Sequence, residues 1–165
     1  MTASFAIHES NEVGETTSVA TDVNFGSSDT PNLTTASYPI DVGDNSYEKW
    51  ERFQFTGSFN KIENLKVWKS AGNYQTDEVI NTNGTTSGYS QASFATPTAS
   101  GSSEATIAIP TSEPAGANMG IAGALSGSLT AVGYSDYWVL QTTSSASTEA
   151  GDGNQKTFTI KYQES

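Results

Sequence analysis

The sequence predicts an all-β protein, an antiparallel β-sandwich of the jelly-roll or immunoglobulin-like kind with about 8–10 strands. The first observation is that apolar and polar residues alternate in most segments rich in aromatic and β-branched residues, as in half-buried strands. The second is that clusters of Gly, Asn, Asp, Ser and Pro separate these segments and favour turns. Because the 165 residues are enough for one ordinary domain and show no internal repeat, we predict a single β-sandwich domain over residues 1–165.

Seven segments are predicted to be strands. The clearest covers residues 51–59, in which Phe53, Phe55, Gly57 and Phe59 occupy alternate positions and polar residues occupy the others. We expect the phenylalanine face to be core, since successive side chains of a strand point to opposite sides. By the same alternation we expect strands at residues 19–25, 38–42, 64–69, 105–109, 137–142 and 156–162.

The glycine-rich run at residues 114–135 fits both a helix and a strand. Ile121, Leu125 and Leu129 follow one another at intervals of four, yet they also belong to the odd-numbered positions of a strand. Three interior glycines would each cost a helix about 1 kcal/mol relative to alanine. We therefore predict a weakly packed strand that lies opposite a bulky neighbour such as Tyr137 or Trp138.

Two regions differ from the rest of the chain in composition. Residues 1–30 hold few large apolar side chains, so we interpret them as an extended N-terminal arm or, equally, as a frayed first strand. Residues 70–104 form a long polar insertion with only a few large apolar side chains. A loop of that length is usually functional or mobile.

The composition bounds the function. The chain carries 18 acidic and 7 basic residues, a net charge of −11, which argues against a nucleic-acid partner because phosphate backbones are bound mostly by Lys and Arg. There is no cysteine, so a disulfide framework and a thiol nucleophile are excluded. We see neither a signal peptide at the N-terminus nor a transmembrane helix, and we expect a soluble protein without membrane contacts.

Five of the seven basic residues lie within one stretch of the sequence. One stretch of 21 residues contains Lys49, Arg52, Lys61, Lys66 and Lys69, whereas both ends of the chain are acidic or neutral. One interpretation is a solvated strand face, because lysines commonly protect strand edges from pairing. The other is a basic interface that meets an acidic patch of a partner or of a second copy.

Aromatic residues give a further signal for binding. Trp50 and Trp68 occupy even-numbered positions, opposite the predicted core face of Phe53 and Phe55, so one or both could be exposed. An exposed Trp suits an interface or the stacking of a sugar, and the alternative is a second buried face. As candidate interface or ligand contacts we select Trp50, Arg52, Trp68, Lys66, Lys69 and Tyr89.

Residues for catalysis are scarce, and we predict no enzyme, no catalytic residue, no cofactor and no metal. The single histidine, His8, lies near the N-terminus, and no nucleophile elbow or phosphate-binding loop occurs. Paired carboxylates of a glycosidase are harder to exclude, because the fold alone can bring two together. The turns around Asp44 and Asp152 offer oxygen ligands for calcium, although Asp, Asn and Gly are also ordinary turn residues.

Four segments together resemble small β-sandwich structural proteins of tailed bacteriophages, of the capsid decoration or cement type. They are residues 50–59 (WERFQFTGSF), 62–69 (IENLKVWK), 134–141 (YSDYWVLQ) and 155–164 (QKTFTIKYQE). The resemblance lies in the style of these segments and rests on no diagnostic motif. It implies a subunit that sits on a capsid or tail lattice and acts without catalysis, often as a trimer or another symmetric oligomer.

From this resemblance we expect a virion structural protein located on the capsid or tail surface. Its partners would be the major capsid protein or neighbouring copies, in a homo-oligomer for which a trimer is favoured. The alternative is an extracellular carbohydrate-binding or adhesin-type module, which would be a monomer with an exposed Trp or Tyr. Either protein would use a rigid sandwich with polar loops, so the sequence leaves both open.

Overall fold

The computed structural model describes residues 2–84, 91–148 and 154–165. In this part of the chain ten strands form two sheets, and all their pairings are antiparallel, which confirms the predicted all-β sandwich. The strands are β1 (Thr2–Asn11), β2 (Thr16–Ala20), β3 (Lys49–Ser58), β4 (Ile62–Ala71), β5 (Val79–Thr82), β6 (Ile107–Ala108), β7 (Ser128–Leu129), β8 (Gly133–Tyr134), β9 (Trp138–Thr143) and β10 (Thr157–Glu164), with one short 3-10 helix at Thr35–Ser37.

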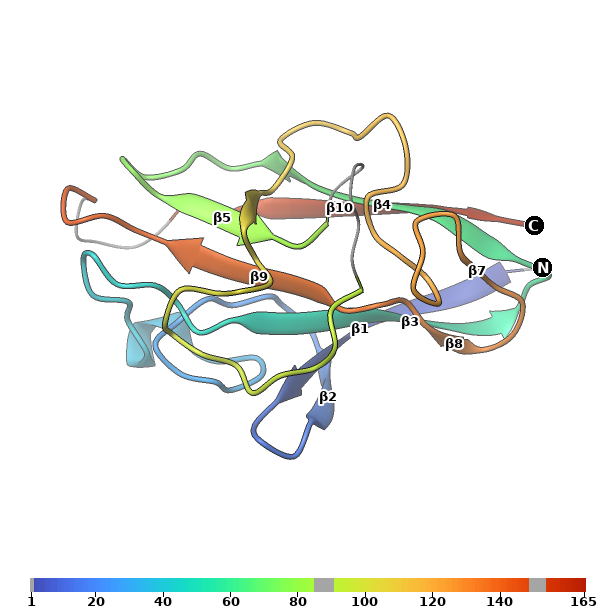
Figure 1. Cartoon of the computed structure of the whole chain (residues 1–165), viewed down its shortest axis with the longest axis horizontal. Coiled ribbons are helices and arrows are strands. Elements are labelled where there is room, and N and C mark those ends of the chain that lie inside the picture. The colour runs from blue at the N-terminus through green and yellow to red at the C-terminus, as the bar shows by residue number, and fades with distance from the viewer. Residues whose placement is uncertain (1, 85–90, 149–153) are drawn as a thin grey trace.

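The two sheets differ greatly in size. The large sheet has the strand order β2-β1-β3-β9-β5-β6, and β8 pairs with β3 beyond the end of β9. The small sheet has the order β10-β4-β7. In Figure 1, β4 and β10 run along one layer of the molecule, and β1 and β3 run along the other. Both chain ends lie at the same end of the sandwich, where the backbone N–H of Ala3 donates to Oε1 of Glu164 at 3.0 Å.

The main core lies between the two sheets and follows the alternation in the sequence. Phe53 and Phe55 of β3 are fully buried against Leu65 and Val67 of β4, as predicted. Burying such side chains contributes roughly 1.5–3 kcal/mol each. The inward residues of β10 complete this core: Phe158, Ile160 and Tyr162.

A β-bulge in β4 turns two non-alternating residues toward the core. Ile62 and Leu65 are both fully buried although they are three positions apart. Between them the register with β10 shifts by one residue, and Asn64 has a φ of 54°. Asn tolerates this left-handed conformation better than other residues, which allows the extra residue of the bulge to be accommodated.

A second apolar cluster covers part of the outer face of the large sheet. Trp50 of β3 is fully buried there against Tyr137 and Val139, beneath Ala92 and Phe94 of the segment that follows β5. The indole N–H of Trp50 donates to the Glu48 carboxylate at 3.0 Å, and the same carboxylate accepts from the backbone N–H of Thr98. The polar insertion at residues 70–104 therefore contains β5 and part of the segment that covers Trp50.

Predictions about four segments are corrected. The N-terminal region is not a free arm, because β1 forms the second strand of the large sheet and pairs with β3 along nearly its whole length. Residues 38–42 form no strand, and of residues 19–25 only the first two belong to β2. The glycine-rich run is not a helix, as expected, but it contributes only the short strands β7 and β8, with tight turns between residues 121 and 127.

The described part of the chain contains no helix that is long and apolar enough to span a membrane.

Candidate functional site

The predicted contact residues do not form one surface. Trp50 is fully buried, so it cannot contact a partner, and Lys66 and Lys69 are 9% and 7% exposed. Arg52 and Trp68 are half-buried, but Arg52 is in the large sheet and Trp68 is in the small sheet. Tyr89 lies outside the described residues.

The basic stretch does not form one exposed surface, because its side chains are engaged within the chain. Lys49 is fully buried, and its Nζ lies 2.8 Å from Oε1 of Glu9. Nζ of Lys69 donates to the carbonyl of Gly72 and lies 4.6 Å from the centre of the Tyr74 ring. The other five basic residues each meet a carboxylate: Arg52 with Glu15, Lys61 with Glu63, Lys66 and Lys161 with Glu113, and Lys156 with Glu78.

One part of the large sheet presents an outer face that is not covered. Val19 of β2 is 56% exposed, and the residues beside it on β1, β3 and β8 are half-buried. The registers of these strands place the side chains in rows on the same side of the sheet. We call this surface the open face and define it by Thr17, Val19, His8, Arg52, Gln54 and Tyr134.

A chain of hydrogen bonds orders the polar groups of the open face. Nε2–H of His8 donates to the amide oxygen of Gln54 at 3.1 Å, because that oxygen can only accept. The amide nitrogen of Gln54 donates to the hydroxyl of Tyr134 at 2.9 Å. The ring of His8 also meets the ring of Tyr134 edge-on, with centroids 5.4 Å apart. The Tyr134 ring is therefore held in place by its neighbours on the sheet.

Arg52 connects the open face to the covered part of the sheet. Its guanidinium carbon lies 4.5 Å from the ring centre of Tyr134 and 5.0 Å from that of Tyr137. One of its terminal nitrogens donates to the hydroxyl of Thr17 at 3.1 Å and lies 3.6 Å from the Glu15 carboxylate. Burial, together with its hydrogen bond to Glu15, raises the pKa of Tyr137 to about 12, so this hydroxyl stays neutral.

The outer side of the small sheet carries a second group of polar residues near Trp68. Trp68 is opposite Thr159 of β10, and Lys66 is opposite Lys161. Glu113 lies between the two lysines, with Oε1 at 3.2 Å from Nζ of Lys66 and 2.8 Å from Nζ of Lys161. These two hydrogen bonds lower the pKa of Glu113, which keeps the carboxylate charged and offsets the repulsion between the lysines.

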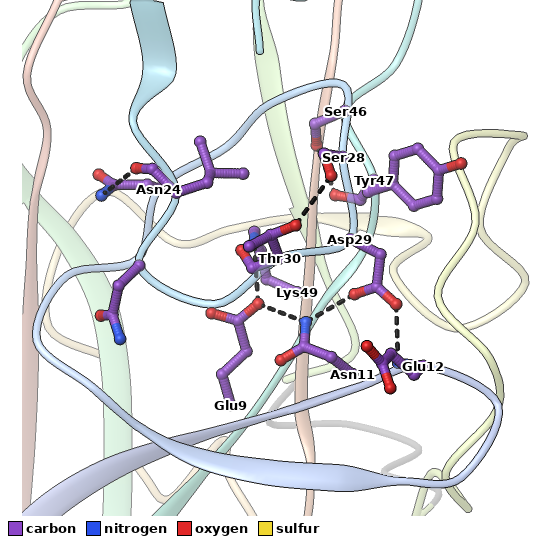
Figure 2. Close-up of polar contacts among 12 residues, drawn as sticks. Glu9, Asn11, Glu12, Asn24, Ser28, Asp29, Thr30, Ser46, Tyr47 and Lys49 are labelled. Atoms are coloured by element: carbon purple, nitrogen blue, oxygen red, sulfur yellow. Dashed lines mark hydrogen bonds and ion pairs between the residues drawn. The ribbon is translucent and has the colours of Figure 1, made fainter. Parts of the chain in front are cut away.

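A buried charged cluster closes one end of the sandwich (Figure 2). Oε1 of Glu9 accepts from Nζ of Lys49 at 2.8 Å and from Nδ2 of Asn11 at 2.8 Å. Nζ of Lys49 also donates to the carbonyl of Thr30, and Nδ2 of Asn11 to Oδ1 of Asp29. The cluster therefore fixes the loop that follows β2 to strands β1 and β3.

Glu51 is the unusual member of this buried cluster. It lies directly opposite Glu9 in the β1–β3 register and is fully buried, and among the described residues neither of its oxygens has a hydrogen-bond partner. Burial and the nearby Glu9 carboxylate raise the pKa of Glu51 well above its ordinary value, and Lys49 opposes this only in part. Two carboxylates thus face each other, as a glycosidase would need, but both are fully buried.

No group of three or more Asp, Glu or His side chains among residues 2–84, 91–148 and 154–165 is arranged to hold a metal ion. The turn that includes Asp41 and Asp44, which we considered for calcium, lines a shallow open hollow together with Ile40 and Ser100. The second such turn includes Asp152, which lies outside the described residues.

The sequence indicates only part of the open face. It points to Arg52 as a contact residue, but it gives no sign that His8 and Tyr134 lie beside it. The alternation in β3 already placed Arg52 and Gln54 on one face. The missing information was the pairing of β1 and β8 with β3, because these contacts join residues that are far apart in the sequence.

The chain shows no similarity to any of the family models, curated proteins or solved structures with which it was compared. Its function must therefore be argued from its own surfaces.

Proposed function

We propose that this chain is a non-catalytic virion structural protein of the capsid decoration or cement type, which acts by protein–protein contact. The observation that carries the proposal is the open face, a sheet surface with exposed Val19 at its edge and Arg52 and Tyr134 ordered at its centre. Arg and Tyr are enriched where protein interfaces gain most of their affinity. A sheet face of this kind suits a partner protein better than a small substrate, because small substrates usually bind in clefts.

The engagement of the basic residues supports the same proposal. With the basic side chains already bonded within the chain, the net charge of −11 leaves an acidic surface. Such a surface repels the phosphates of a packaged genome and favours basic partner surfaces. The capsid or tail exterior is therefore the location that we propose.

The experiment that tests this function is mass spectrometry of virus particles purified from cultures of the organism that encodes the chain. We expect the protein in the particles at a constant ratio to the major capsid protein. Absence from particles that contain all their other structural proteins would overturn the proposal. A second test is binding of the purified chain to particles that lack it, which we expect to weaken for Tyr134→Ala and to remain unchanged for Tyr38→Ala, an exposed tyrosine outside the open face.

A carbohydrate-binding or adhesin-type module is the second candidate. It is favoured by one observation: the half-buried Tyr134 ring lies beside the polar groups of Gln54 and His8, an arrangement that allows a sugar to stack and to form hydrogen bonds. A glycan screen distinguishes the two functions. Binding that is lost in Tyr134→Ala and kept in Tyr38→Ala would support the module and count against the virion protein.

A further inference from the structure

The edge strand β10 differs from the other edges of the two sheets. It spans eight residues, and no described strand pairs with its second edge. The other edge strands in the described part of the chain are shorter: β2 has five residues, and β6 and β7 have two each. A long unpaired edge offers a row of backbone donors and acceptors to another strand.

β10 also lacks most of the devices that usually protect such an edge. It contains no proline, and both irregularities of its pairing place the extra residue in β4, so β10 itself is regular. Its charged residues, Lys161 and Glu164, are exposed and do not point into the core. Proteins commonly use bulges, prolines, inward-pointing charges or edge lysines to prevent edge pairing. The edge lysine of β10, Lys161, is already bound to Glu113, with its Nζ 2.8 Å from Oε1.

The inward side chains of β10 are incompletely covered. Phe158, Ile160 and Tyr162 pack on the core but are only half-buried, whereas Leu65 and Val67 on the neighbouring strand are fully buried. Phe5, which stacks on Tyr162 with ring centroids 6.3 Å apart, is 37% exposed. An additional strand beside β10 would cover this apolar side.

The distribution of charge indicates which partner can approach β10. The three strands of the small sheet carry three lysines and two glutamates, whereas the rest of the chain carries four basic and sixteen acidic residues. Two copies of a chain with net charge −11 would repel each other over most of their surfaces. The small sheet lacks this acidic excess, so two copies can meet there.

We propose that the free edge of β10 pairs antiparallel with the same edge of a second copy of this chain. The proposal deepens the function proposed above, that of a virion structural protein acting by protein–protein contact, and rests on it. A register that places Ile160 opposite Ile160 of the second copy sets Phe158 against Tyr162 and Thr159 against Lys161. This register pairs aromatic side chains and keeps the two copies of Lys161 apart. Because both subunits use the same surface, the result is a closed two-fold dimer.

The test is a pair of opposite charges at Thr159, a half-buried residue whose hydroxyl bonds to that of Ser70. Lysine there would face Lys161 of the second copy, and glutamate would form an ion pair with it. We expect Thr159→Lys to weaken self-association at least tenfold and Thr159→Glu to leave it equal or tighter, as measured by sedimentation equilibrium. The net charge alone would produce the opposite order, because only the lysine variant becomes less acidic.

Controls at Ser58, an exposed residue on the inner strand β3, separate the edge from net charge. Ser58→Lys and Ser58→Glu change the charge equally and should leave the β10 contact intact. Wild-type protein that stays monomeric up to its solubility limit would overturn the inference. Self-association that is unchanged in both Thr159 variants would overturn it too. Either result would leave the virion function untouched, because that function is tested by the particle experiment.

Discussion

His8 and Arg52, the only histidine and the only arginine of the chain, lie directly opposite each other on the antiparallel strands β1 and β3. Both contact the ring of Tyr134, which His8 meets edge-on and over which the Arg52 guanidinium lies. A planar guanidinium can stack on two rings at once, whereas the ammonium group of lysine cannot reproduce this geometry. The open face thus depends on the identity of Arg52 and not only on its charge.

Arg52→Lys should therefore destabilise the protein although the charge is retained. Two cation–π contacts at a partly exposed site contribute about 0.5–1 kcal/mol each, so we expect a loss of about 1–2 kcal/mol in the free energy of unfolding. Urea unfolding followed by fluorescence measures it. Lys61→Arg is the control, because Lys61 forms only a surface ion pair with Glu63. Exchanging the cation in such a pair changes the free energy of unfolding very little. Equal stability of wild type and Arg52→Lys would contradict the prediction.

The stability of the protein should depend on pH through Glu51. In the unfolded chain this carboxyl titrates near its ordinary pKa of 4.5, whereas burial beside Glu9 raises the pKa in the folded protein. Between these two values the unfolded state binds fewer protons, so the free energy of unfolding falls as the pH rises. The contribution of Glu51 is complete below about pH 4.5 and is lost above the raised pKa.

Glu51→Gln removes this titration while preserving the size of the side chain. We expect the stability of the variant relative to wild type to increase as the pH rises from 4.5, measured by urea unfolding at several pH values. Glu63→Gln, at a half-buried position whose side chain is 38% exposed, is the control and should show a nearly constant difference. A constant or falling difference for Glu51→Gln would mean that Glu51 is charged in the folded protein.

The strands of the core could be predicted from the sequence because their apolar pattern is local. β3, β4, β9 and β10 all have runs of alternating or continuous apolar residues, and each appears within a few residues of its expected place. Residues 38–42 show the same alternation, but Tyr38 and Val42 are 39% and 44% exposed and no strand forms. Alternation alone is insufficient where no partner strand is available.

The buried charges could not be predicted from the sequence for a different physical reason. Lys49 and Glu51 occupy the same odd-numbered face as Phe53 and Phe55, where the pattern suggests a polar strand end. They are buried because Glu9 and the loop around Thr30 close over them. Whether a charged residue at the end of a strand is exposed or buried depends on distant segments of the chain. Here the burial of Lys49 depends on Glu9, which lies 40 positions away in the sequence.

Lys49→Met should destabilise the protein strongly. It removes the ammonium group that faces Glu9 and leaves two buried carboxylates opposite each other. Breaking one partner of a buried ion pair typically costs about 3–5 kcal/mol. The double variant Glu9→Gln/Lys49→Met removes both charges and should be more stable than Lys49→Met alone. Urea unfolding of the two variants measures this, and equal or lower stability of the double variant would contradict it.

Trp50 and Trp68 differ in burial, although their positions in the sequence predict the same face for both. Trp50 is fully buried under the segment that contains Phe94, whereas Trp68 is half-buried on the outer side of the small sheet. Trp50→Ala removes a large core side chain, for which a loss of about 3–5 kcal/mol is typical. It also deprives the buried Glu48 carboxylate of the indole hydrogen bond.

We therefore expect Trp50→Ala to lower the free energy of unfolding by several times more than Trp68→Ala. The variant should also expose the segment around Phe94 to proteases, since Trp50 is the main side chain beneath it. Urea unfolding and limited proteolysis with proteinase K, followed by mass spectrometry of the first fragments, test both expectations. Similar losses for the two variants, or first cleavage outside residues 91–106 in Trp50→Ala, would mean that Trp50 does not hold this segment on the sheet.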